Sequence, residues 1–213
     1  MTEKIKLIAV GTAGTLWAKQ LSQKDINEQN ILAIGTSPCD KKVFPNNIWV
    51  QPALIPVLEH TQDNSQFPLY YSIFQCGESV SQLDEETLNK AEYPSQLKEI
   101  KSFLQNTNQL VILLGLGALT SSILAPQITK MTKEMNITTT LVATTPFSWE
   151  GAIRRAQAEG TVKLLKQTVN NLIVYDMQQL EKQMPEEKYS KPLFEVADRE
   201  ILKIVQNTLQ KLS

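Results

Sequence analysis

The chain has 213 residues, of which 42% are hydrophobic, and a formal net charge of −1 at pH 7. A chain of this size can bury one good-sized core but is short for two, which indicates a single domain. Lys and Arg number 21 against 22 Asp and Glu, without a basic block, so the composition argues against nucleic-acid binding. The apolar runs are strand-sized and the polar start MTEKIK lacks the core of a secretory signal, which predicts a cytoplasmic protein without membrane insertion.

The first part of the chain alternates an apolar run with a glycine turn. Residues 4–11 predict a first strand, the sequence GTAG at 11–14 predicts a tight turn, and residues 15–23 predict a helix. The sequence NILAIG predicts a second strand that ends at Gly35. Each strand therefore leads into a loop at one edge of the predicted sheet.

The middle of the chain is harder to assign. Within residues 41–82, the segments 43–50 and 69–74 fit short strands, joined by extended connections that contain several prolines. Residues 83–106 have a helical pattern in which Pro94 marks a break or a second start.

The sequence between residues 109 and 160 contains two strand, loop and helix units in succession. The run LVILLG ends at Gly115 and is typical of a strand covered on both faces of a parallel sheet. Gly117 and a cluster of hydroxyl residues then lead into a predicted helix, and a glycine turn that opens a helix suits a phosphate. A β-branched strand begins at Ile137 and ends at Pro146, and the loop PFSWEG begins the next predicted helix.

Beyond residue 160 the pattern continues to the end of the chain. Residues 171–176 predict a strand, residues 178–188 predict a polar connection, and residues 192–212 predict an amphipathic helix. Strands that alternate with helices indicate an α/β fold with a three-layer, doubly wound, mainly parallel sheet, which is Rossmann-like. Ligands of such sheets bind at the carboxyl ends of the strands.

The cysteines, the histidine and two of the tryptophans belong to no recognisable catalytic or metal-binding motif. Cys39 and Cys76 have no metal-binding spacing and are interpreted as buried thiols. His60 is interpreted as a surface residue, and Trp17 and Trp49 as core or interface residues. The sequence therefore predicts no metal site and no catalytic residue.

Four segments resemble the tubulin/FtsZ family of GTPases. ATTPFSWEGAIRRAQAEG resembles the TxPFxxEGxxR motif of that family, and GALTSSI followed by LAP resembles its signature loop GGGTGTG followed by AAP. KIKLIAVGTAG resembles the first strand and glycine-rich loop of the family, and FEVAD resembles the FxxAD that starts its central helix. The resemblance covers nearly the whole chain and is strongest from residue 109 onward.

The resemblance implies a guanine-nucleotide site with GTP or GDP as the ligand, and leaves Mg²⁺ open. Glu150 and Arg154 match family residues at the ribose, Phe194 matches an aromatic residue at the base, and Asp198 matches the group that pairs with the guanine edge. Pro146 belongs to the same motif as Glu150. The residues expected to wrap the phosphates are Gly11, Thr12, Gly14, Gly115, Gly117, Thr120 and Ser121.

The chain also departs from the family pattern. Ala118, Leu119 and Ser121 replace glycines of the signature loop, and we expect their side chains to crowd a ligand or strain the loop. Ser37 replaces an acidic residue near the γ-phosphate. In the family, the residues that position water for hydrolysis come from an acidic loop after the central helix of the next subunit, and residues 1–213 are expected to form one domain without that loop or a second domain. Weak or absent GTP hydrolysis is therefore predicted.

Two hypotheses remain open at this point. In the first, the protein is an FtsZ-like guanine-nucleotide-binding domain related to bacterial cell division and the cytoskeleton. In the second, it is a pseudo-GTPase that acts as a protein–protein interaction module without nucleotide. The partners expected in either case are other copies of the chain or FtsZ-type filament subunits.

Overall fold

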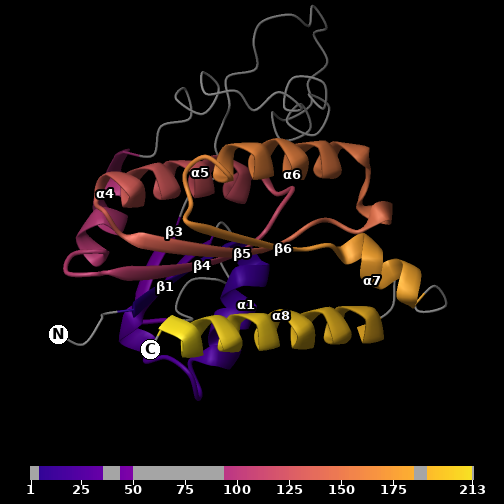
Figure 1. The fold of residues 1–213 in the computed structure, drawn as a ribbon, viewed down its shortest axis with the longest axis horizontal. Coiled ribbons are helices and arrows are strands. Elements are labelled where there is room, and N and C mark those ends of the chain that lie inside the picture. The colour runs from indigo at the N-terminus through magenta and orange to yellow at the C-terminus, as the bar shows by residue number, and fades with distance from the viewer. Residues whose placement is uncertain (1–4, 36–43, 50–93, 185–190, 213) are drawn as a thin grey trace, which may run out of the picture.

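The computed structural model describes residues 5–35, 44–49, 94–184 and 191–212 (Figure 1). The sequence predictions for the segments 69–74 and 83–93 lie outside these ranges. So do those for Ser37, Cys39, His60 and Cys76.

A single sheet of six strands forms the centre of the molecule, in the order β3-β2-β1-β4-β5-β6. Every neighbouring pair is parallel, as predicted. Val10 pairs with Leu114, and Leu114 pairs with Ala143, so the central strands β1, β4 and β5 end side by side at the carboxyl edge of the sheet. The strands are β1 Ile5–Val10, β2 Ile31–Gly35, β3 Asn46–Trp49, β4 Gln109–Gly115, β5 Thr138–Thr144 and β6 Asn171–Tyr175.

Helices cover both faces of the sheet and make a three-layer structure (Figure 1). The helices α4, α5 and α6 lie on one face, and α1 and α8 lie on the other. Alternate residues of β1 point to opposite faces of the sheet. Ile8 packs in the core beneath α4, α5 and α6, and Leu7 packs in the core beneath α1 and α8. The helices are α1 Gly11–Leu21, α4 Pro94–Phe103, α5 Leu119–Glu134, α6 Ala152–Leu165, α7 Met177–Gln183 and α8 Lys191–Leu212, with 3₁₀ turns η1 Glu28–Asn30 and η3 Ser148–Glu150.

The first helix begins earlier than the sequence predicts. Gly11 is its first residue, with φ of +73°, and Val10 before it is extended. The sequence GTAG therefore forms the first helical turn, and the prediction of a separate turn was wrong. The reason is that one glycine with positive φ is enough to change the chain direction between strand and helix.

Residues 177–183 form the helix α7, where a polar connection was predicted. Asp176 caps this helix, because its Oδ1 accepts a hydrogen bond from the Gln178 N–H at 3.0 Å. Met177 and Leu180 on its inner side are buried against Leu193. The helix is stabilised by these tertiary contacts more than by its own composition.

Candidate functional site

Three helices begin at the carboxyl edge of the sheet without a side-chain cap. They are α1 after β1, α5 after β4 and α6 after β5, and none of them receives a capping hydrogen bond from its N-cap side chain. The first N–H groups of a helix have no partner inside the helix, and the helix dipole is positive at this end. Since β1 and β4 are neighbours, the starts of α1 and α5 offer N–H groups to the same region.

Two predicted site glycines serve close packing beside this region. A Cβ atom at Gly14 would lie 2.4 Å from the carbonyl oxygen of Leu113, so the glycine lets α1 lie directly on β4. A Cβ atom at Gly117, where φ is +82°, would lie 2.6 Å from the carbonyl oxygen of Arg154 and 2.7 Å from Pro146 Cγ. The loop after β4 is thus packed onto the loop after β5, and Pro146 is buried in that contact.

The other predicted residues of the first loop are more open. Apart from its chain neighbours and the nearby helix backbone, no atom of the described residues lies within 4 Å of the position that a Cβ atom would take at Gly11, and Thr12 is exposed. At Gly115 a Cβ atom would make ordinary contacts of 3.6 Å with Ala13 and Thr144, so this glycine is not sterically required.

The loop after β4 carries its side chains without backbone strain. Ala118 is extended, with φ of −95°. Among the described residues other than glycine, positive φ occurs only at Asn106 and Asn136, so the expectation of a strained loop was wrong. Ser121 is 2% exposed and its hydroxyl contacts the carbonyl oxygens of Gly115 and Ala118 at 2.7 and 2.9 Å, so it is turned into the loop.

The side chains of Leu119 and Thr120 lie outside the described part of the structure. For Ser121, in contrast, the expectation of crowding does not hold, because its hydroxyl faces the protein. A ligand at this loop would therefore meet the backbone N–H groups of the first turn of α5 rather than the Ser121 hydroxyl.

Glu150 and Arg154 form an ion pair at the same edge. The distance between Glu150 Oε2 and Arg154 Nη1 is 3.1 Å, and the Arg154 side chain is 46% exposed. Glu150 Oε1 also accepts a hydrogen bond from the Phe147 N–H at 2.8 Å. The two residues lie in different elements, because Gly151, with φ of +101°, separates η3 from α6.

Glu181 fixes this loop from α7, and it was not predicted from the sequence. Glu181 is 8% exposed, and it accepts hydrogen bonds from the N–H of Ser148 at 3.0 Å and from its hydroxyl at 2.6 Å. Arg155 donates to the carbonyl oxygen of Ser148 at 2.7 Å. The available sequence signal was weak: Asp176 as a helix cap, followed by apolar residues spaced three apart.

Aromatic side chains meet where the loop after β5 approaches the start of α8. The rings of Phe147 and Trp149 are stacked with centroids 5.2 Å apart. Phe194 of α8 lies edge-on to both, at 5.3 and 6.0 Å, and remains 43% exposed. Phe194 thus combines a fixed position with an open surface, as a stacking platform requires.

Asp198 lies one helical turn beyond Phe194 and has a partner in α1. Its Oδ1 accepts a hydrogen bond from the indole N–H of Trp17 at 2.7 Å. Trp17 is 3% exposed, so of the two predicted alternatives, core or interface, it takes the first, but its contact with Asp198 could not be predicted from the sequence. At the end of β6, burial and then the charge of Glu200 raise the pKa of Tyr175 above 10.0, so the phenol stays neutral at physiological pH.

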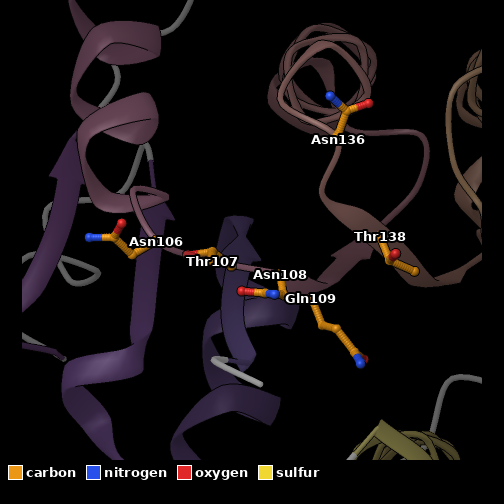
Figure 2. Close-up of a pocket in the computed structure, with 6 residues that line it drawn as sticks. All are labelled: Asn106, Thr107, Asn108, Gln109, Asn136 and Thr138. Carbon is orange, nitrogen blue, oxygen red and sulfur yellow. The ribbon is translucent and has the colours of Figure 1, made fainter. Parts of the chain in front are cut away.

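Figure 2 shows a pocket of about 330 Å³ at the opposite edge of the sheet, lined by neutral polar side chains. Its residues precede or begin β4 and β5, and none of them is a predicted site residue.

Within the described ranges, no three His, Cys, Asp or Glu side chains group as metal ligands. None of the helices in the part of the chain that the structure covers is long and apolar enough to cross a membrane.

Residues 4–185 match the family model described as the Tubulin/FtsZ family, GTPase domain. Because the match covers most of the chain, the chain belongs to this family. A segment of 136 residues is 30% identical to the cell division protein FtsZ 1 of Archaeoglobus fulgidus, covering 63% of this chain and 35% of that protein. A segment of 87 residues is 37% identical to the cell division protein FtsZ of Haemophilus influenzae, covering 41% of this chain and 21% of that protein.

Solved structures share the fold. The empty FtsZ dimer of M. jannaschii has a TM-score of 0.72 at 23% identity, over 99% of this chain and 55% of that one. The GTPγS-bound protofilament of CetZ2 from Haloferax volcanii has a TM-score of 0.63 at 16% identity, over 97% of this chain and 58% of that one. The chain thus spans a little over half the length of these solved chains, and a fifth to a third of the curated relatives' length is aligned.

Proposed function

We propose that this chain is a cytoplasmic guanine-nucleotide-binding domain, related to cell division and the cytoskeleton, that binds GTP or GDP and hydrolyses GTP weakly or not at all. One observation carries the proposal: α1 and α5 begin without a side-chain cap directly after β1 and β4, which are neighbouring strands, at the carboxyl edge of the sheet. Backbone N–H groups and two helix dipoles there suit the phosphates without help from a lysine or arginine.

The remaining parts of a nucleotide fit the residues around this edge. The ribose would meet Glu150 and Arg154, which hold each other in place at 3.1 Å. The base would stack on the exposed face of Phe194, while Asp198 in the next turn of α8 would accept hydrogen bonds from the guanine edge. A carboxylate at this position favours guanine, which presents N–H donors, over adenine, whose N1 is an acceptor.

We expect weak hydrolysis because the carboxylates described near this edge already have hydrogen-bond partners within the protein. Glu150, Asp176, Glu181 and Asp198 each accept a hydrogen bond from the protein itself. A group that orients an attacking water must be within hydrogen-bond reach of that water and able to accept its proton. Each of these four side chains holds a loop or a helix in place, and Glu150 and Asp198 are assigned to the ribose and the base. We therefore assign none of them to the attacking water, and no step to Mg²⁺.

Replacing Asp198 with alanine is expected to weaken GDP binding about 5- to 150-fold, the range that corresponds to the loss of a hydrogen-bonded charged group. The measurement is calorimetric titration of the wild type and the variant. Asp25→Ala is the matched control, because Asp25 also bonds to α8, through Gln206 at 3.0 Å, but lies in an exposed contact away from the carboxyl edge. Equal affinity of Asp198→Ala and the wild type would remove Asp198 from the site.

A second candidate function, a pseudo-GTPase that binds another protein, is favoured by one observation. The large hydrophobic side chains that the structure shows as exposed are Leu16 at 55%, Ile153 at 46% and Phe194 at 43%. Ile153 and Phe194 lie near the starts of α6 and α8 at this edge of the sheet, and Leu16 lies midway along α1. The partner in this case would be another copy of the chain or an FtsZ-type filament subunit.

Co-sedimentation with preformed FtsZ filaments tests this second function. If the apolar edge is a contact surface, the wild-type chain pellets with the filaments and the double variant Leu16→Ser, Ile153→Ser stays in the supernatant. Pelleting of both proteins to the same extent would exclude these two side chains from the contact.

A further inference from the structure

The strand β6 forms one edge of the sheet, and no strand among the described residues pairs with its outer side. The neighbouring strand β5 is buried from Thr139 to Thr144, whereas β6 is only half-buried from Leu172 to Tyr175. An edge strand presents backbone N–H and C=O groups that can pair with a further strand. The outer side of β6 is therefore a surface on which the sheet can be extended.

The peptide groups of Leu172 and Val174 face this outer side. The carbonyl oxygen of Tyr175 accepts a hydrogen bond from the Thr145 N–H at 3.0 Å, so it points back toward the β5 side. Peptide groups alternate in direction along a strand, which turns those of Leu172 and Val174 outward. The side chains of the same two residues pack against the core beneath α6, as does that of Val162.

A groove of about 680 Å³ lies between α6 and β6. Two exposed residues of α6, Glu159 and Lys166, carry opposite charges at this groove. They are two helical turns apart, about 10 Å along the axis, which is too far for them to pair with each other. The other side chains that line the groove are mostly apolar: Thr145, Ala158, Val162, Lys163, Leu172 and Val174.

The strand matches its own copy about a twofold axis perpendicular to the sheet. When the axis passes through Ile173, β6 pairs with the β6 of a second copy in the antiparallel direction. Leu172 then lies opposite the partner's Val174, and Val174 lies opposite the partner's Leu172. Because both residues turn their peptide groups outward, each of these two pairs exchanges both N–H to O=C hydrogen bonds.

The charges on α6 match about the same axis. Glu159 and Lys166 lie at equal distances on either side of the midpoint between Val162 and Lys163, and Val162 lines the groove together with Leu172. The axis therefore places Glu159 of each copy opposite Lys166 of the other, with the apolar side chains between the two ion pairs. Lys163 approaches its own copy, but between exposed side chains this repulsion is small.

We propose that β6 and α6 form the contact of a twofold dimer of this chain, in which the two sheets join into one. A twofold contact requires a surface that complements itself, and this surface combines an unpaired strand, an apolar groove and matched opposite charges. The inference does not depend on the proposed nucleotide site. Antiparallel pairing directs the carboxyl edges of the two sheets in opposite directions, so both candidate sites remain open in the dimer.

Charge exchange on α6, followed by sedimentation equilibrium, tests the contact. Lys166→Glu places like charges together at both symmetry-related positions, and we expect it to weaken the dimer about tenfold or more. Glu159→Lys combined with Lys166→Glu restores opposite charges, so its dissociation constant should return to within about threefold of the wild type. Lys98→Glu, at an exposed position of α4, makes the same change in net charge and should leave the dimer unchanged.

Disulfide cross-linking tests the register of the two strands. Ile173 would face its own copy as a pair without hydrogen bonds, with Cα atoms about 4.5 Å apart, which a disulfide can span. In a chain that also carries Cys39→Ser and Cys76→Ser, Ile173→Cys should form a covalent dimer under mild oxidation. Asn171→Cys is the matched control, because it would lie about 13 Å from its own copy and should stay monomeric on a denaturing gel.

Three results would overturn the inference. The first needs no variant: wild-type chain, folded by circular dichroism, that sediments as a monomer at hundred-micromolar concentration would show that the edge of β6 takes a different partner or none. The second is a dimer that Lys166→Glu and Lys98→Glu affect equally. The third is cross-linking of Asn171→Cys as efficient as that of Ile173→Cys, which would exclude an axis at Ile173.

Discussion

Replacing Gly14 with alanine is expected to lower the free energy of unfolding by about 2–3 kcal/mol, the upper range for an added methyl group in a closely packed core. The added Cβ atom would lie 2.4 Å from the carbonyl oxygen of Leu113 and 3.1 Å from its carbonyl carbon. Both atoms belong to the backbone of a central strand, so they cannot move aside as a flexible side chain can. α1 must lift from β4, and the contacts of Trp17 and Leu21 with the sheet are weakened.

The control for this prediction is Gly160→Ala. Gly160 lies inside α6, and beyond its own helix backbone no atom in the part of the chain that the structure covers is within 4 Å of its Cβ position. Alanine is favoured over glycine in a helix interior by about 1 kcal/mol, so this variant should be as stable as the wild type or more stable. Urea unfolding of the three proteins measures both effects. A Gly14→Ala variant as stable as the wild type would show that α1 does not lie as close to β4 as described.

Replacing Glu181 with alanine is expected to lower the free energy of unfolding by about 2 kcal/mol, because it leaves the partly buried N–H and hydroxyl of Ser148 without their acceptor. Glu181 accepts both hydrogen bonds at 3.0 and 2.6 Å and is itself 8% exposed. The variant should also weaken GDP binding, since the loop that Glu181 fixes carries Glu150. Both effects are measured on one protein sample, by urea unfolding and by calorimetry.

Glu200→Ala is the comparison for Glu181. Glu200 pairs with Lys203 at 2.8 Å in an exposed contact, where the two side chains are 40% and 59% exposed. Such a surface pair contributes about 0.5 kcal/mol or less. If Glu181→Ala lost no more stability than Glu200→Ala, the buried contact with Ser148 would not stabilise the loop after β5.

The sequence predicts the sheet well because its strands are parallel and buried. A strand covered on both faces must be apolar along its length, and LVILLG of β4 shows this pattern directly. The glycines that end or follow the strands then mark the starts of the helices. The prediction failed at α7, because a short helix of polar composition is stabilised by what it packs against, here Leu193 and Ala197.

The candidate site was predicted only in part. The resemblance led to Glu150 and Arg154, and the structure brings them to 3.1 Å of each other. The contacts that hold the surrounding residues could not be predicted, since Glu181 bonds to Ser148 and Trp17 bonds to Asp198 from elements that are distant in the sequence. Gly14 was predicted to contact the phosphates. Its close approach to the carbonyl oxygen of Leu113 in β4, which gives it a packing role, could not be predicted from the sequence.

The most direct test of a guanine-nucleotide site is calorimetric titration of the purified, nucleotide-free chain with GTP, GDP and ATP in the presence of Mg²⁺. Uncapped helix starts at the carboxyl edge, an exposed Phe194 and an acidic Asp198 predict micromolar or tighter binding of GTP and GDP, and much weaker binding of ATP. The absence of heat with all three nucleotides, from protein shown to be folded by circular dichroism, would contradict the account.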